Sequence, residues 1–337
     1  MKTVTWGILG LGKIAEKFAA AVNSLENTAL VCASRTEEKA AAFAARHHAK
    51  RYYGSYQQLV EDAEVDIIYV ATPMLCHYED VKLCLLHGKN VLCEKSVTVN
   101  ARQWSELSAL AKSRGLFLME AMWTKCLPSY RTVKAWLAQG KIGKPRVVHA
   151  QFNNLCPYDE TDRLYKLSLG GGSLLDIGVY VLTFACDLLG YAPAHMESGM
   201  QRLPDGVDVF DTMLLRYPDG AIAALTATFS FSSENMAYIL GERGSIQIGP
   251  WFHQAEHAAL LDASGQVQER FDTPFSCNGY EYEILEAQRC LAAGLTESPL
   301  VPHGETLAIM QHMDTIRRQH GLIFPDTPYE EMIGEIN

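Results

Sequence analysis

The chain has 337 residues, 48% of them hydrophobic and 20% charged, which is enough for two domains and too long for one comfortable core. Its formal net charge of −10 argues against a nucleic-acid partner, because phosphate binding needs a basic surface. The N-terminal apolar run is short and broken by glycines, unlike a signal peptide. No run approaches the roughly 20 apolar residues of a membrane span, so we expect no such segment.

The nine cysteines are scattered and contain no C-x-x-C pair. Several lie in apolar runs, such as Cys32 in ALVCAS and Cys93 in NVLCEK. Thiols in such surroundings are typical of reduced core residues, so we expect a cytoplasmic protein without disulfides.

The first 120 residues alternate short apolar runs with longer segments of helical period. The runs are VTWGILG, TALVCAS, DIIYVAT, NVLCEK and GLFLME. Such alternation predicts right-handed crossovers and a parallel, doubly wound sheet covered on both faces. We assign residues 1–122 to this α/β domain, which would bind a dinucleotide.

The pattern changes at Trp123. A helical stretch, PSYRTVKAWLAQ, precedes the strand RVVHAQFN, and a triple-glycine turn precedes the helix SLLDIGVYVLTFACDLLG. Alternating segments then run from about Met196 to Phe271, separated by turn signals, and two helices close the chain. We therefore expect residues 123–337 to form an α+β domain with a large, open, mostly antiparallel sheet.

A phosphate-binding turn is predicted after the first strand. Gly10, Gly12, Lys13 and Ile14 lie in GLGKIA, a G-x-G-x-x-A variant of the dinucleotide fingerprint. Glycines let the backbone approach a pyrophosphate, and the following helix N-terminus supplies N–H groups and positive potential. A tight strand–helix turn is the structural alternative, but the repeats that follow favour a cofactor.

The end of the second strand favours NADP over NAD. NAD sites usually place an acidic residue there to hold the ribose hydroxyls. This chain has Ser34, Arg35 and Thr36 instead. A guanidinium with two hydroxyls suits a 2′-phosphate, which a carboxylate would repel. The alternative is that Arg35 covers the adenine or faces solvent.

Polar residues follow three predicted strands at the edge where ligands of a doubly wound sheet bind. They are Thr72 and Pro73 with His77 beyond, Glu94 and Lys95, and the stretch from Glu120 to Trp123. This position predicts that Lys95 lies near the nicotinamide end of a cofactor, although a solvated loop lysine is the plain alternative.

The segment GGGSLLDIGVY supplies the second set of candidates. Asp176 and Tyr180 are four residues apart and share one face of a helix. Structural explanations exist for both, because Ser173-x-x-Asp176 is a capping box and Tyr180 could be a core aromatic. The three glycines leave bare backbone, which is expected where a ligand approaches closely.

GLGKIA, the tripeptide EKS in place of E-K-P, EAMWTKCLP and GGGSLLDIGVY together resemble the Gfo/Idh/MocA oxidoreductases. The closest branch is that of the dimeric dihydrodiol dehydrogenases and NADP-dependent D-xylose 1-dehydrogenases. The resemblance implies a Rossmann domain, a substrate domain with an open sheet and, often, dimerisation through that sheet. It maps the family's lysine onto Lys95, its aspartate onto Asp176 and its histidine onto Tyr180.

Two departures bear on mechanism. Ser96 stands where the family has proline, so a cis peptide there would be more expensive. A tyrosine replaces histidine, and a phenol with a pKa of about 10 needs a nearby cation to accept protons at neutral pH. We hypothesise hydride transfer between NADP(H) and a carbinol carbon of a sugar, polyol or cyclic dihydrodiol. Tyr180 would be the base, Lys95 would lower its pKa, and Asp176 would orient the substrate or hold Lys95 charged.

Five pocket residues follow from the resemblance, although each alone could be a core residue: His77, Trp123, Phe152, Trp251 and Phe275. The histidine pair His253-x-x-x-His257 has helical metal-ligand spacing but lies between strands without an obvious third ligand, so no metal site is predicted. The rival function is a catalytically silent NADP(H)-binding regulator or redox sensor on the same fold.

Overall fold

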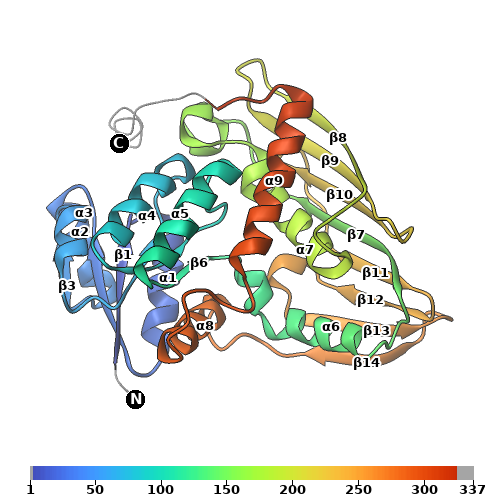
Figure 1. Ribbon diagram of the computed structural model, residues 1–337, viewed down its shortest axis with the longest axis horizontal. Coiled ribbons are helices and arrows are strands. Elements are labelled where there is room, and N and C mark those ends of the chain that lie inside the picture. Colours follow the sequence, from blue (N-terminus) through green and yellow to red (C-terminus); the bar gives the residue numbers. More distant parts are fainter. Residues whose placement is uncertain (1–2, 325–337) are drawn as a thin grey trace. The chain divides into compact units, whose positions relative to one another are not determined.

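The computed structural model describes residues 3–324, which divide into two compact units. One contains the chain up to Trp123 together with Phe275–Leu307. The other contains Thr124–Pro274 and, within the described residues, 308–324. The sequence pattern predicts a single boundary at residue 122. Residues 275–307 nevertheless group with the first unit, because helix α8 (Tyr280–Ala292) packs against α1 (Lys13–Ser24) (Figure 1).

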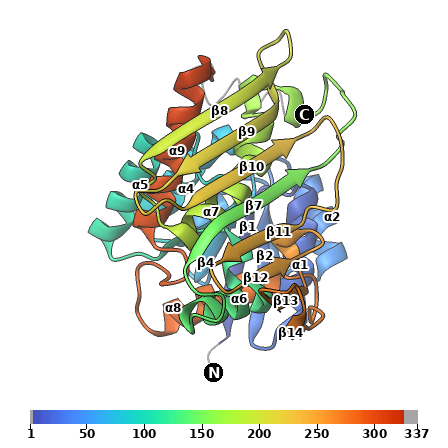
Figure 2. The same cartoon turned by 90° about the vertical axis from the view of Figure 1, so that its right-hand side faces the viewer.

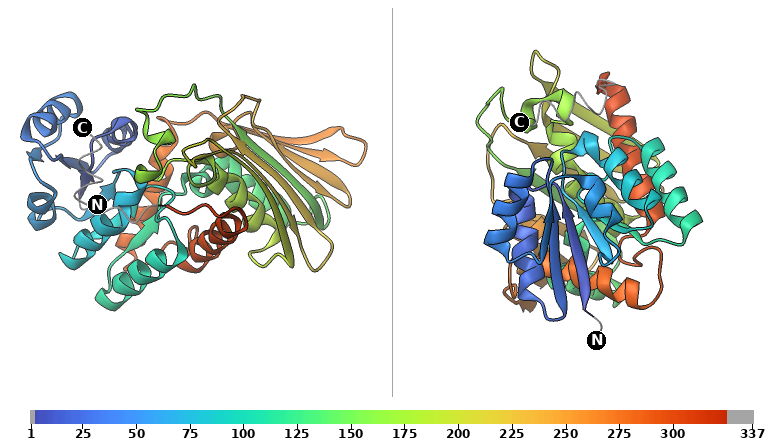
Figure 3. Two further views of the ribbon diagram at one scale, coloured as in Figure 1. Left: turned by 90° about the horizontal axis from the view of Figure 1, so that it is seen from above. Right: turned by 90° about the vertical axis from the view of Figure 1, so that its left-hand side faces the viewer.

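The first unit is built on a six-stranded parallel sheet in the order β3-β2-β1-β4-β5-β6 (Figure 3, right). The order proceeds outward from β1 in both directions, which creates the switch point where doubly wound sheets bind ligands. Its strands are β1 (Val4–Leu9), β2 (Thr28–Ala33), β3 (Arg51–Tyr53), β4 (Ile67–Val70), β5 (Asn90–Cys93) and β6 (Leu118–Glu120). Its other helices are α2 (Glu37–His47), α3 (Tyr56–Glu61), α4 (His77–Leu86) and α5 (Ala101–Arg114).

Aromatic packing explains why the central strands read as continuous apolar runs. Trp6 on β1 and Tyr69 on β4 are completely buried against Phe18 of α1. The rings of Phe18 and Tyr69 stack with centroids 3.6 Å apart, and Trp6 meets Phe18 edge-on at 5.3 Å. Burial on both faces is the condition for an all-parallel sheet, so the predicted fold class is confirmed for this unit.

The second unit carries an eight-stranded sheet in the order β14-β13-β12-β11-β7-β10-β9-β8 (Figure 2). Every pairing is antiparallel except that of β7 with β10, which confirms the expected mostly antiparallel sheet. Its strands are β7 (Pro145–Asn153), β8 (His195–Arg202), β9 (Asp208–Arg216), β10 (Ile222–Thr228), β11 (Ala237–Gly241), β12 (Gly244–Ile248), β13 (His257–Asp262) and β14 (Val267–Asp272). The helices are α6 (Pro128–Ala138), α7 (Val179–Leu189) and most of α9 (His303–His320).

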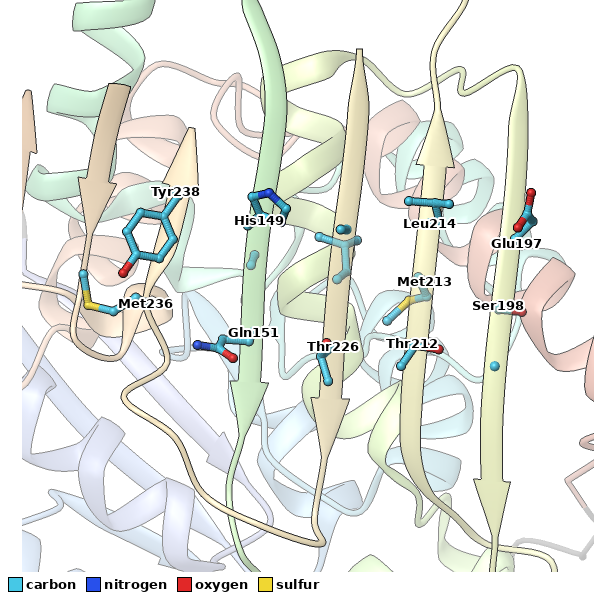
Figure 4. A pocket seen from close by; sticks show the side chains of 14 residues that line it. His149, Gln151, Glu197, Ser198, Thr212, Met213, Leu214, Thr226, Met236 and Tyr238 are labelled. Atoms are coloured by element: carbon cyan, nitrogen blue, oxygen red, sulfur yellow. The ribbon is translucent and has the colours of Figure 1, made fainter. Parts of the chain in front are cut away.

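One face of this sheet is open. Helix α7 packs against β7 and β10 on the inner face, whereas no helix of the described chain covers the outer face (Figure 2). The outer face is hollowed into a concavity of about 710 Å³ (Figure 4). Polar and apolar side chains mix across it, among them His149, Gln151, Thr212, Leu214, Thr226, Met236 and Tyr238.

The expectation that no run reaches the length and hydropathy of a membrane span is wrong. The stretch Leu167–Leu189 is long and apolar enough to cross a membrane. However, 78% of its most apolar window is buried inside the protein, as in the core helix of a globular domain. The cysteines follow the prediction: all nine are free, and only Cys156 and Cys277 are not buried.

The triple-glycine turn is explained by the chain's contact with itself. A Cβ at Gly171 would lie 2.6 Å from the Leu164 carbonyl oxygen, and one at Gly172 would lie 2.0 Å from Oδ1 of Asp208. Gly170 and Gly172 also have positive φ values of 78° and 128°. These contacts require glycine whether or not a ligand approaches, which is a simpler reason than the one inferred from sequence.

The capping box predicted at Ser173 is absent. Ser173 has helical backbone angles and makes no cap hydrogen bond. Asp208, on the neighbouring strand, accepts the Leu174 N–H at 2.6 Å in its place. The segment continues as a π-helical turn, η5 (Leu174–Gly178), and then as α7.

Gly172→Ala should lower the free energy of unfolding by about 3 kcal/mol, because the methyl group would collide with Asp208 in a left-handed backbone conformation. Gly265→Ala is the matched control, since Gly265 also has positive φ but open space around it, and we expect a loss of about 1 kcal/mol. Urea unfolding of both variants measures the difference. Equal losses would show that the approach to Asp208 is not tight.

Candidate functional site

The turn after β1 has the form of a phosphate cradle. Gly10 has φ 92°, and a Cβ there would lie 2.8 Å from the Thr72 side chain. Gly12 is the N-cap of α1, makes no side-chain cap and has open space around its Cβ position. Lys13 and Ile14 begin the helix beside it, and Lys13 is exposed. The first backbone N–H groups of α1 therefore fit a pyrophosphate.

The end of β2 carries no carboxylate at positions 34–36. Ser34 is buried, and its N–H donates to the Tyr53 carbonyl at 3.1 Å. Thr36 caps α2 by accepting the Lys39 N–H at 3.4 Å, so its hydroxyl proton is still available for donation. Arg35 is partly exposed and lies near Tyr56. Burial raises the pKa of Tyr56, and the positive charge of Arg35 offsets part of that rise.

His77 braces two loops of the first unit. Its ring nitrogens lie 2.8 Å from the Thr72 carbonyl oxygen and 3.1 Å from the Ser96 carbonyl oxygen, and the residue is only 1% exposed. The Thr72 hydroxyl donates to Asp80 at 2.6 Å, and Pro73 begins a short 3-10 turn. Burial and these bonds give His77 a supporting role in the two loops, and its contact with a ligand stays a prediction.

Glu94 and Lys95 lie where β5 leaves the sheet. Glu94 accepts hydrogen bonds from the Tyr69 hydroxyl and, at 3.2 Å, from the Lys95 N–H. The Lys95–Ser96 peptide is cis, the form that the absence of proline made costly, and Ser96 is completely buried. Lys95 itself is partly exposed.

Sequence reasoning missed Glu283, a fully buried residue of α8. Burial and the neighbouring charge of Glu94 raise its pKa well above the usual range for a glutamate. Only the packing of α8 on this unit brings the two acids together, since nearly 190 residues separate them in sequence.

Asp176 lies in the π-helical turn of the second unit, with its side chain 15% exposed. Arg163 forms an ion pair with it at 3.3 Å from the short helix η3 (Arg163–Tyr165). No local sequence pattern indicates Arg163. The pairing needs glycine at position 171, because a Cβ there would lie 2.7 Å from the Arg163 carbonyl oxygen and 2.6 Å from that of Leu164.

Tyr180 belongs to an aromatic cluster in the same unit. Its ring centroid lies 5.6 Å from that of Phe152 and 5.1 Å from that of His253. Phe152 stacks on His253 at 4.0 Å, and Trp251 meets Phe152 edge-on at 6.2 Å. Two predicted substrate residues, Phe152 and Trp251, are thus grouped with the predicted base.

His253 and His257 diverge. His257 pairs with Asp272 on the edge strand β14, whereas His253 is buried in the aromatic cluster. Within residues 3–324, no group of three His, Cys, Asp or Glu side chains has the arrangement of a metal site.

The remaining predicted residues lie in the first unit. Trp123 stacks on Tyr280 with ring centroids 4.4 Å apart, and Gly279 leaves room for this ring. Phe275 contacts Tyr282 edge-on at 5.9 Å. Lys95, His77, Trp123 and Phe275 therefore belong to one compact unit, whereas Asp176, Tyr180, Phe152 and Trp251 belong to the other.

Two family models match this chain, one within each of the two units. A family model described as "Oxidoreductase family, NAD-binding Rossmann fold" matches residues 4–122, and the GFO/IDH/MocA C-terminal domain matches residues 130–247. The trans-1,2-dihydrobenzene-1,2-diol dehydrogenase of Macaca fascicularis is 35% identical over 332 residues, covering 95% of this chain and 98% of that protein. The Homo sapiens enzyme of the same name is 34% identical over 333 residues, with the same coverage.

Solved structures agree with this relationship. A 3-ketoreductase from Actinomadura kijaniata, in complex with NADP, is 27% identical, with a TM-score of 0.83 over 94% of this chain and 98% of that one. An aldose-aldose oxidoreductase from Caulobacter crescentus shares the fold, with a TM-score of 0.85 at 24% identity over 95% of this chain and 98% of that one. With matches to both family models and identities of about 35% across nearly the whole length, the chain belongs to the Gfo/Idh/MocA family of oxidoreductases, as its sequence motifs indicated.

Proposed function

We propose that this protein is an NADP-dependent dehydrogenase that transfers hydride between the nicotinamide and a carbinol carbon of a sugar, polyol or cyclic trans-dihydrodiol. The proposal rests on the position of Lys95, which is partly exposed and directly follows the carboxyl end of a buried parallel strand. Ligands of this sheet type bind at that edge. Relatives named as diol dehydrogenases, a ketoreductase and an aldose oxidoreductase support the substrate class.

The proposed cofactor is NADP, held by the uncapped N-terminus of α1 and the residues that follow β2. Gly10 and Gly12 would admit the pyrophosphate, and Arg35 with Ser34 and Thr36 would hold the 2′-phosphate. The absence of a carboxylate at these positions and the NADP bound to the related ketoreductase both support this choice. When bound, the nicotinamide supplies the hydride acceptor or donor.

Arg35→Ala should raise the KM for NADP by about 10- to 100-fold, the range expected when one charge-assisted contact to a phosphate is lost. The KM for NAD should change by less than about twofold, because NAD lacks the 2′-phosphate. Lys39→Ala, which removes an exposed charge on the helix that follows, α2, is the control. Steady-state kinetics with both cofactors test the proposal, and equal effects on the two would remove Arg35 from phosphate recognition.

The proposed acid–base group is Tyr180. It would take the substrate hydroxyl proton during oxidation and return it during reduction. Lys95 would supply the cation that lowers the phenol pKa, and Asp176 would orient the substrate or keep Lys95 charged. The aromatic side chains of Phe152, Trp251, Trp123 and Phe275 would suit the C–H face of a sugar or a cyclic diol.

Lys95→Met and Tyr180→Phe should each lower kcat by about 10²- to 10⁴-fold, the usual contribution of an acid–base group, with the Kd for NADPH within a few-fold of wild type. If the two residues act on one substrate, the double variant should be little slower than the slower single variant. Lys112→Met and Tyr52→Phe are exposed controls. Additive losses would indicate independent roles, and near-normal activity of Lys95→Met would reject the mechanism.

A catalytically silent NADP(H)-binding regulator remains the second candidate, since a cofactor cradle alone serves a sensor equally well. NADPH formation with a panel of aldoses, inositols and trans-dihydrodiols separates the two. Tight NADPH binding without turnover on any of them would favour the regulator.

We also propose that the protein is a cytoplasmic homodimer that pairs through the open face of its eight-stranded sheet. The support is the uncovered outer face with its mixed polar and apolar side chains and the family's frequent use of this sheet for dimerisation. Reduced cysteines support the cytoplasm.

Thr226→Arg should convert the dimer to a monomer, because a two-fold axis would bring two new charges close together at the centre of this face. Sedimentation velocity reports the mass, and circular dichroism checks the fold. Ser113→Arg, at an exposed position of α5, is the control. A monomeric wild type would reject the proposed interface.

A further inference from the structure

Two aspartates of β9 point to the same side of the sheet because the strand contains a bulge. On the β8–β9 ladder, Gln201 pairs with Phe210 but Arg202 pairs with Asp208, so Val209 has no counterpart. Residues three apart on a regular strand face opposite sides. The bulge turns both Asp208 and Asp211 inward, where they are 1% and 0% exposed.

These two carboxyl groups converge on the start of the segment that carries Asp176 and Tyr180. The Ser173 hydroxyl lies 2.5 Å from Oδ2 of Asp211 and 3.3 Å from Oδ2 of Asp208. Asp208 also accepts the Leu174 N–H at 2.6 Å, and its Oδ1 lies against Gly172. The arrangement ties residues 172–174 to β9.

No cation neutralises this site among residues 3–324, and Oδ1 of Asp211 is buried without a hydrogen-bond partner. On β8, Met200 pairs with Asp211, and Arg202, which pairs with Asp208, reaches the Gly321 carbonyl. On β10, Ala227 pairs with Asp211. From the glycine turn only Ser173 contributes a polar side chain, and Asp176 on the same segment is paired with Arg163.

Two buried carboxylates without a cation cannot both be charged at low cost. Burial raises the pKa of both, and the charge of Asp208 raises the pKa of Asp211 further. The contacts determine which one ionises first. Asp208 accepts the Leu174 N–H, whereas Oδ1 of Asp211 has no donor, so Asp208 is the better site for the charge and Asp211 for the proton.

We propose that Asp208 and Asp211 work as one carboxylic acid–carboxylate pair that shares a single proton, and that this pair positions the segment bearing Asp176 and Tyr180. Both are positioning residues, because they act through residues 172–174 and not on the substrate. The catalytic consequence rests on the proposed function, whereas the anchoring of the segment does not.

The pair makes the anchoring depend on pH. The Asp211 pKa in the folded protein is raised above its unfolded value, so its contribution to stability is complete at low pH. That contribution is lost as the pH rises through the folded pKa, because the second charge is then buried beside the first. Residues 172–180 should therefore loosen as the pH rises through the folded pKa of Asp211.

Hydrogen–deuterium exchange of peptides covering residues 172–180, corrected for intrinsic rates, measures this directly across a pH series. In the wild type we expect protection to fall at least about tenfold as the pH rises through the folded pKa of Asp211. Asp211→Asn should stay within about twofold, because an amide has nearly the same shape as the carboxyl group and does not titrate. Asp205→Asn removes an exposed carboxylate of the preceding loop, so it should behave like the wild type.

Ser173→Ala is a second variant, which serves if Asp211→Asn does not fold. The serine hydroxyl favours the charged form of both acids, so its removal should move the loss of protection to higher pH. An unchanged pH response in either variant would overturn the proposal, because the titrating group would then lie elsewhere.

The fall of kcat as the pH rises gives the catalytic readout. In Asp211→Asn this fall of kcat should become smaller, as should the loss of protection from hydrogen exchange. An identical kcat profile despite altered exchange would overturn the positioning role. Altered exchange in a protein that turns over no substrate would leave the anchoring supported and reject the proposed function alone.

Discussion

One hydrogen bond determines where the functional segment of the second unit begins: the Leu174 N–H donates to the carboxylate of Asp208. The segment that follows is apolar and almost wholly buried, and it has no side-chain cap of its own. A buried helix start leaves N–H groups that need acceptors, so the acceptor comes from a neighbouring strand. The turn must then lie so close to β9 that only glycine fits at position 172. The π-helical turn with Asp176 and the helix with Tyr180 both start from this point.

The first unit obeys a different constraint. Strands buried on both faces can carry polar groups only at their ends, and those groups must satisfy one another before they can serve a ligand. His77 joins the loops after β4 and β5, and Glu94 bonds to Tyr69 and to the backbone of Lys95. Several polar side chains at the sheet edge therefore support the loop that carries Lys95.

Each unit also contains a buried acid whose neutral form is favoured. Burial raises the pKa of Glu283 beside Glu94 and that of Asp211 beside Asp208. In both cases the charge of a second carboxyl group nearby raises the pKa further. A neutral carboxyl can donate a hydrogen bond where a carboxylate only accepts, so protonation changes what each buried acid can contact.

Local patterns were enough to predict much of the molecule. Alternating runs predicted the parallel and antiparallel sheets, because burial on two faces or on one leaves a periodic signal in sequence. The glycine turn at Gly10 and Gly12 was likewise readable, since its backbone requirement is local. The motifs also identified the family. Tertiary structure alone decided the grouping of residues 275–307 with the first unit, the burial of His77 and the Arg163–Asp176 pair. It also replaced the capping box at Ser173 with Asp208, because a one-residue bulge turned that side chain inward. These features depend on contacts between residues far apart in the chain, and no local periodicity records them.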